Sequence, residues 1–324
     1  LLDLTKGESD RQGQLDLSRV VSTAGLAADV PQFCTDVRNQ PFDKGELAEE
    51  MLEATLPAIR DKTGGKFGFE VRNFNRSIGA RLAGEIARRH GNEGMREAPL
   101  DILLRGTAGQ SFGAWNVSGL NLSLIGDAND YVGKGMAGGR LVIYPPMDSR
   151  FETRAAPIMG NTCLYGATGG ELFAAGVVGE RFAVRNSGAV TVVEGCGDHG
   201  CEYMTGGRAV ILGPVGRNFG AGMSGGIAYV YDPEEVFAAK VNYEMVALED
   251  LDDTDRQFLL DTVTRQRDLT GSAVAERILQ VEAVEGHGGS HQPWVGTAEP
   301  IEERDRDHEP GAHPFGPDLR DRAR

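Results

Sequence analysis

The residues best suited to chemistry are Asp198, His199, Gly200 and Cys201, which follow one another in the chain. A histidine beside a cysteine can lower the pKa of the thiol and produce a nucleophilic thiolate. The alternative is an ordinary polar corner of the repeat described below. Cys196, His199 and Cys201 make a poor metal set, because no second CxxC or distant histidine pair completes four ligands. We expect a structural corner here.

Two glycine-rich stretches match the dinucleotide-binding pattern GxGxxG, at residues 133–138 and 220–225. That pattern holds a pyrophosphate only where a strand precedes it and a helix N-terminus follows it. Strand-like sequence follows instead, at residues 141–144 and 227–231. We therefore predict turns of a repeat at both places and no cofactor site.

The nucleophile-elbow pattern GxSxG also occurs twice, at residues 109–113 and 222–226, but neither copy leads into a helical pattern. Lys134 and Arg140 could bind an anion, although pairing with neighbouring groups is favoured. Four histidines are expected in a solvated tail: His287, His291, His308 and His313. Neither a Walker A loop nor an HExxH motif is present. The sequence thus predicts no catalytic, cofactor-binding or metal-binding residue in this chain.

The composition excludes several classes of protein. The chain has 324 residues, a formal net charge of −15 and 45 glycines, about twice the usual share. Phosphate contacts need a basic surface, so a nucleic-acid partner is not expected. No apolar run is long enough for a membrane helix, and four cysteines in a chain of this length predict reduced thiols. We expect a cytoplasmic protein. Because it begins at Leu1 without a methionine, it is expected to be either a fragment or a separately encoded subunit.

Five segments differ in texture. Residues 1–43 read as an irregular lead-in. Residues 44–99 predict a helix from Gly45, a strand over 66–71, and a second helix that Ser77 precedes and Gly91 ends. Residues 100–232 hold 27 of the 45 glycines and read as strands and turns. Residues 233–284 predict helices over 248–269 and 273–279, and residues 285–324 read as a disordered tail.

The central segment is a repeat. A short glycine-containing turn precedes each apolar run, and the last glycines of these turns are Gly119, Gly139, Gly170, Gly188, Gly207 and Gly226. Their spacing is nearly constant except between Gly139 and Gly170, where a polar insertion occupies residues 147–157. Three positions after each glycine we align one column: Leu122, Val142, Phe173, Thr191, Val210 and Tyr229. Nine positions after it, Gly179, Gly197 and Gly216 recur.

A unit of about 19 residues cannot bury its own apolar face, so the units must stack. Equivalent strands then pair in parallel about 4.8 Å apart, and such crossovers are right-handed. We predict a mainly β protein, a right-handed parallel β-helix flanked by helices that could cover an open end. Arg140 and Glu171 lie one place after their glycines in neighbouring coils, which predicts an ion pair.

These residues closely resemble the C-terminal GXGXG domain of the glutamate synthase large (alpha) chain. The resemblance lies in residues 106–113 (GTAGQSFG), 126–135, 164–171, 179–188, 197–207 and 213–232. It extends to residues 71–79 and 84–90, and residues 15–17 resemble the stretch that follows the synthase barrel. It covers roughly residues 1–280; the polar tail beyond Leu279 departs from the aromatic, basic closing segment usual in the family.

The resemblance implies a role in ammonia assimilation. The parent enzyme hydrolyses glutamine in an amidotransferase domain and converts 2-oxoglutarate to glutamate in a barrel domain that uses FMN and an iron–sulfur cluster. Electrons come from NADPH through a beta subunit, or from ferredoxin. In this family the β-helix is a scaffold for those domains, which are its expected partners. The resemblance assigns no catalytic residue and no cofactor to this chain.

Two alternatives remain. One is a stand-alone GXGXG assembly subunit that resembles those of formylmethanofuran dehydrogenase or N-methylglutamate synthase, although the matches in residues 1–100 favour glutamate synthase. The other is a carbohydrate-active β-helix enzyme, which needs an exposed groove of carboxylates and aromatic residues. The low aromatic content, 7%, argues against that enzyme.

Overall fold

The computed structural model describes residues 45–285 and 294–298, together with scattered positions between 14 and 37. The chain divides into two compact units, Leu1–Asp43 and Lys44–Arg324. The described positions of the first unit are turn or irregular, and all are exposed. The helices and strands described below belong to the second unit.

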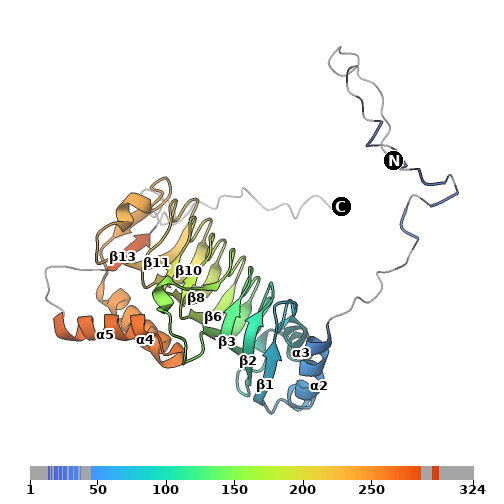
Figure 1. The fold of residues 1–324 in the computed structure, drawn as a ribbon, viewed down its shortest axis with the longest axis horizontal. Helices are drawn as coiled ribbons and strands as arrows, with labels where there is room; N and C mark the ends of the chain where they lie inside the picture. Colours follow the sequence, from blue (N-terminus) through green and yellow to red (C-terminus); the bar gives the residue numbers. More distant parts are fainter. Residues whose placement is uncertain are drawn as a thin grey trace, which may run out of the picture. The chain divides into compact units, whose positions relative to one another are not determined.

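Eight strands stack in parallel along one side of the second unit (Figure 1). Seven parallel pairings join them in chain order, so the backbone coils about seven times. This confirms the predicted β-solenoid; its right-handed sense stays a prediction. The stack begins inside the segment 44–99. The strands are β1 (Gly65–Val71), β2 (Leu100–Ala108), β3 (Leu120–Ala128), β4 (Ala137–Tyr144), β6 (Gly169–Ala174), β8 (Ser187–Val193), β10 (Thr205–Ile211) and β11 (Gly225–Tyr231).

Three of the coils have a second, shorter strand. These strands are β5 (Pro157–Met159), β7 (Val177–Val178) and β9 (Gly195–Cys196), and they also pair in parallel. Met159 joins this row to Ala128 at the end of β3. The predicted insertion is a loop before β5, and it contains the short 3-10 helix η2 (Thr153–Ala155).

The observed register corrects the predicted column. The residues that lie side by side are Ser123, Val142, Phe173, Val192, Val210 and Tyr229. Leu122 and Thr191 were therefore assigned wrongly, each by one residue. Asn121 and Val190 lie two places after their corner glycines, but they pair with Arg140 and Arg208, which lie one place after theirs, so the distance from corner glycine to strand is not constant. A shift of one residue moves a side chain to the other face of the sheet.

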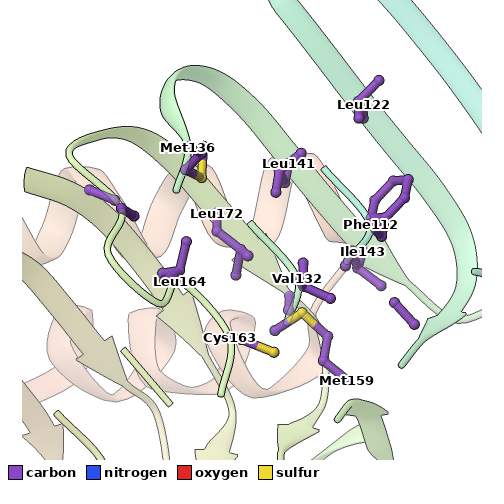
Figure 2. Packing of buried hydrophobic residues seen from close by; sticks show 14 of the residues in the cluster. Phe112, Leu122, Val132, Met136, Leu141, Ile143, Met159, Cys163, Leu164 and Leu172 are labelled. Carbon is purple, nitrogen blue, oxygen red and sulfur yellow. The ribbon is translucent and has the colours of Figure 1, made fainter. Parts of the chain in front are cut away.

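The inside of the coil is a continuous apolar core. Figure 2 shows part of this core, with Leu122, Leu141 and Leu172 from successive strands and Val132 and Leu164 from the turns. All five side chains are fully buried. Side chains at alternate strand positions point inward, as a pleated strand requires.

Two helices close the N-terminal end of the solenoid, as predicted. They are α2 (Glu46–Asp61) and α3 (Ala80–His90), and both bury apolar residues in the solenoid core (Figure 1). Pro57 lies inside α2 without ending it, and Gly91 ends α3 as predicted. The predicted N-cap at Ser77 is wrong. Ser77 has a positive φ, and Gly79 precedes the helix instead.

Two further helices, α4 (Asp253–Thr270) and α5 (Ala273–Glu285), cover the outer face of the later strands. Their apolar residues pack with Phe173, Val210 and Tyr229 in a second core. The helix predicted from residue 248 begins later because Asp252 and Asp255 form a capping box there. The residues before it form β12 (Ala247–Glu249) and the predicted helix over 273–279 continues to residue 285.

A final strand, β13 (Trp294–Ala298), lies in the segment predicted as a disordered tail. It pairs antiparallel with β11 and with β12. The prediction is wrong for these five residues, because the open edge of β11 offers backbone groups that need a partner. The Trp294 ring packs at 5.2 Å from the Tyr231 ring. The rest of the tail, including its four histidines, lies outside the described residues.

Glu194 is a buried carboxyl group that ties a coil to α5. Ser272 Oγ donates to Glu194 Oε1 at 2.6 Å, and the same hydroxyl accepts from the Ala275 N–H at the start of α5. Burial raises the pKa of Glu194 above its usual value of 4.5. The ionised form therefore destabilises the folded chain relative to the protonated form.

We predict that Gly216→Ala destabilises the fold. Gly216 does not have a positive φ, so glycine is required there by the lack of space for a side chain and not by the backbone conformation. An added Cβ would collide with Asp198 Oδ1 and with backbone of the preceding coil. The expected loss in free energy of unfolding is about 1–3 kcal/mol, measured by urea unfolding.

The matched control is Gly84→Ala on the exposed side of α3, where an added Cβ meets nothing. It should stabilise by about 0.5–1 kcal/mol. Equal effects of the two variants would contradict the close-packing argument.

We predict that Glu194→Gln raises the melting temperature near neutral pH. The folded wild-type protein loses stability as the pH rises from the usual pKa of the Glu194 carboxyl group, 4.5, through its raised pKa. Glutamine does not titrate, so the variant does not lose stability in this way. The difference in melting temperature should therefore vanish below about pH 4.5 and grow as the pH rises. A thermal scan at each pH measures it. A difference of the same size at every pH would show that the carboxyl group is not destabilised by ionisation.

Candidate functional site

The third side of each coil is a turn in which every second residue has a positive φ. The middle coils show it clearly, with Tyr131, Gly133 and Gly135 at φ values of 64°, 66° and 63°. We call this stack of turns the turn ladder. Its first, middle and third columns are Ser111, Tyr131, Thr162, Arg181, His199 and Asn218; Gly113, Gly133, Leu164, Ala183, Cys201 and Gly220; and Trp115, Gly135, Gly166, Arg185, Tyr203 and Gly222.

Backbone hydrogen bonds run in both directions along this ladder. The Tyr131 N–H donates to the Asn161 carbonyl oxygen of the next coil at 2.9 Å. The Gly133 N–H donates to Phe112 of the preceding coil, also at 2.9 Å, and the Gly135 N–H donates to Tyr165 of the next coil at 2.8 Å. Successive positive-φ residues donate to opposite neighbouring coils, so each turn bonds to both neighbours.

The ladder places many side chains in an unfavourable backbone region. A side chain other than glycine at positive φ costs roughly 1–2 kcal/mol. Twelve of the 15 non-glycine residues with positive φ that are described lie in the ladder. The inter-coil hydrogen bonds hold them there, because changing one φ would break the bonds to both neighbouring coils.

The ladder also explains the two GxGxxG matches. Gly133 and Gly135 are ladder positions, as are Gly220 and Gly222, and β4 and β11 follow the two motifs. No helix N-terminus follows either motif, so a pyrophosphate would have no dipole or row of free N–H groups to meet. The prediction that both motifs are repeat turns is confirmed.

The acid, imidazole and thiol at residues 198–201 do not form a catalytic set. Asp198 binds Arg217 of the next coil, with its Oδ2 at 2.8 Å from the guanidinium. His199 lies in the outward first column, with Nδ1 at 4.0 Å from Glu202 Oε1. Cys201 occupies the middle column and is completely buried in the core. The side chains thus separate as the predicted polar corner requires.

Three cysteines are buried among apolar side chains. Burial raises the pKa of Cys163 and of Cys196 to about 12 and that of Cys201 well above its usual value of 9.0. Figure 2 shows Cys163 beside Met159 and Val132. Burial thus disfavours the thiolate form, which is the nucleophilic form of a cysteine. Within the described part of the chain, no group of three or more His, Cys, Asp or Glu side chains could hold a metal ion.

The remaining candidates also have structural surroundings. Ser111 has a positive φ in the first column, and Ser224 directly precedes β11, so neither serine leads into a helix. Arg140 forms the predicted ion pair with Glu171, at 2.9 Å, and Arg265 of α4 joins the same carboxylate at 2.6 Å. Lys134 stands over an aromatic ring rather than beside an acid, with Nζ at 5.4 Å from the centre of Tyr131.

The sequence interpretation missed the exposed side of the turn ladder. Trp115, Tyr131 and Tyr203 have exposed fractions of 60%, 37% and 49% there. A signal was available in the paired Gly-x-Gly spacings at 133–135 and 220–222, which mark the alternation of φ. The aligned positions in other coils hold side chains other than glycine, so the period of two was hidden.

We predict that only one cysteine reacts quickly with a thiol reagent at pH 8. Cys34 is exposed, whereas the other three thiols are buried and protonated. Their labelling should wait for unfolding, and a Cys34→Ser variant should show no fast phase with Ellman's reagent. Fast labelling of Cys201 in that variant would restore the nucleophile hypothesis.

No helix of the described residues combines the length and apolar character needed to cross a membrane. Comparison with known proteins gives a family. A family model described as "GXGXG motif" matches residues 46–286. Similar proteins include the NADH glutamate synthase of Schizosaccharomyces pombe, 53% identical over 246 residues, which are 76% of this chain and 11% of that protein.

Two further relatives are ferredoxin-dependent glutamate synthases. The protein of Cyanidium caldarium is 52% identical over 212 residues, 65% of this chain and 14% of the relative. The chloroplastic protein of Spinacia oleracea is 45% identical over 239 residues, 72% of this chain and 14% of the relative. The chain thus spans only 11–14% of the length of these relatives. Together with the solenoid and the turn ladder, these matches show that the chain belongs to the GXGXG motif family.

Proposed function

We propose that this chain is the structural β-helix portion of a glutamate synthase and has no active site of its own. The complete enzyme would convert glutamine, 2-oxoglutarate and a reductant to two molecules of glutamate. In this proposal the solenoid holds an amidotransferase domain and an FMN-containing barrel domain at a fixed separation. These domains, in the same chain or another, would be its partners, with a beta subunit as a further one.

The observation that carries the proposal is that the candidate cysteines and acids of the solenoid already have structural surroundings. The thiols of Cys163, Cys196 and Cys201 are buried and protonated. The acids Asp198 and Glu171 are paired with arginines. The glycine motifs that resemble nucleotide sites are the turns that join the coils. The described part of the chain therefore offers a rigid structure rather than a reactive site.

The geometry of the solenoid suits a spacer. Backbone hydrogen bonds join each coil to the next through the main sheet and through the turn ladder. Seven parallel steps of about 4.8 Å give a rod of roughly 34 Å that cannot shorten without breaking these bonds. Helices α2 and α3 close one end of it and β13 lies along the other.

The relatives support the parent enzyme. They are 45–53% identical to this chain, yet the matched part is 11–14% of their length. The machinery of glutamate synthesis would then lie in the parts of those proteins that this chain does not match. FMN and an iron–sulfur cluster would be held there and not by this chain. A cytoplasmic location belongs to the same proposal, in keeping with the four cysteines, which form no disulfide.

The test is a reconstitution. The chain alone should form no glutamate from glutamine, 2-oxoglutarate and reduced donor. A synthase polypeptide that lacks this region should hydrolyse glutamine but release much of the ammonia. Adding the chain should raise the yield toward two glutamates per glutamine, measured as glutamate formed and ammonia released.

Two results would contradict the proposal. Glutamate formation by the chain alone would show a catalytic role. A yield that does not change when the chain is added would show that the solenoid does not couple the two reactions. A heat-unfolded sample of the chain is the control for nonspecific effects of added protein.

A further inference from the structure

Aromatic and cationic side chains gather on the outer side of the turn ladder. They span five successive coils. We call them the ladder patch: Trp115, Tyr131, Lys134, Tyr165, Arg185 and Tyr203. Tryptophan, tyrosine and arginine are the residue types that most often dominate the binding energy of protein interfaces.

The third column shows that these side chains are not needed by the turn itself. Gly135, Gly166 and Gly222 occupy it in three coils, whereas Trp115 and Tyr203 adopt the same positive φ in others. Glycine would fit there without strain. The positive φ of Trp115 and Tyr203 is strain that a glycine would have avoided, which indicates that these two side chains have a function.

Each large ring lies over a glycine of the next coil. An added Cβ at Gly135 would come within 2.9 Å of the Trp115 ring, and one at Gly222 would collide with the ring of Tyr203. The glycine therefore supports one side of the ring. With exposed fractions of 60% and 49%, the remaining surface of Trp115 and of Tyr203 is open to solvent.

The two cations of the patch are held by rings instead of by acids. Lys134 Nζ lies 5.4 Å from the centre of Tyr131 and 5.9 Å from that of Tyr165, and Arg185 Cζ lies 5.9 Å from that of Tyr203. Among the described residues, no carboxylate forms an ion pair with either cation. Their neighbours differ, because Arg181 pairs with Glu202 and Arg217 with Asp198.

The patch is also rigid in its backbone. The N–H groups of Trp115, Arg185 and Tyr203 donate to the next coil at 2.8, 3.0 and 2.9 Å. A binding surface that is already ordered loses little conformational entropy when a partner docks. Two cations that lie over aromatic rings on a stiff surface favour a partner that presents carboxylates at this place.

We propose that the ladder patch is a docking surface for an acidic protein surface, contributed by the catalytic domains of the synthase. The proposal rests on the proposed function, and it names the side of the solenoid that those domains contact. The partner's carboxylates pair with Lys134 and Arg185, and its apolar groups cover the rings of Trp115 and Tyr203.

The first test removes the rings without straining the fold. In Trp115→Gly/Tyr203→Gly, both positions receive the residue that the same column already holds at Gly135, Gly166 and Gly222. The double variant should therefore melt no lower than the wild type. Its dissociation constant for the synthase polypeptide that lacks this region should rise about 10-fold or more, measured by calorimetric titration. The matched control is Leu260→Ala, an exposed apolar residue of α4, which should bind as the wild type does.

The second test removes the charges. Lys134→Gln/Arg185→Gln should weaken binding at low salt and flatten the salt dependence, because exposed charge pairs are screened by added salt. The wild type and the ring variant should both keep a dissociation constant that rises between about 50 and 200 mM NaCl.

The outcomes separate this inference from the proposed function. If the wild-type chain binds the synthase polypeptide and both double variants bind equally tightly, the ladder patch is not the docking surface, while the scaffold role stands. If the charge variant alone binds normally, the partner is not acidic and the inference is overturned. If the wild-type chain does not bind at all, the proposed function fails and this inference fails with it.

Discussion

The hydrogen bonds of the turn ladder are the constraint on which the rest of this molecule depends. Each coil must close on itself and still satisfy its backbone groups on three sides. On two sides parallel strands do this. On the third side the chain turns too sharply for a strand, and the residues with positive φ donate their N–H groups alternately to the next coil and to the preceding coil. Buried backbone groups without partners would otherwise destabilise every coil.

Several features of the chain follow from that ladder. It accounts for the Gly-x-Gly spacing, for most of the strained residues and for the burial of Cys201 in the middle column. It also places outward the side chains that form the ladder patch. The same backbone thus buries a thiol that looked nucleophilic and presents aromatic rings that sequence inspection passed over. A solenoid of this kind offers surface and rigidity more readily than a reactive cleft.

Much of the fold could be predicted from residues alone because repetition strengthens each weak local signal. Six glycine turns in one sequence predicted the coil, its length and the ion pair between Arg140 and Glu171, which the structure confirms. Features that occur only once in the chain had no repetition to strengthen their local signal. The register of β3 and β8 was wrong by one residue, because in those two strands the paired positions begin one residue further from the corner glycine than in β4 and β10. The strand β13 was missed because its partner β11 lies far earlier in the chain, beyond α4 and α5.

The amino-acid sequence by itself determined the solenoid, its family resemblance and the absence of a helix after either GxGxxG motif. Those features are local or periodic, and a glycine at a corner can be recognised without knowing what surrounds it. The tertiary structure alone decided which side chains face out. Trp115 and Tyr203 share a column with three glycines, and Cys201 and His199 are near neighbours in the chain but separate to the core and the surface. Cys201 and His199 both have a positive φ, so the direction of each side chain follows from its column in the turn ladder, and hydrogen bonds to the neighbouring coils hold that column in place.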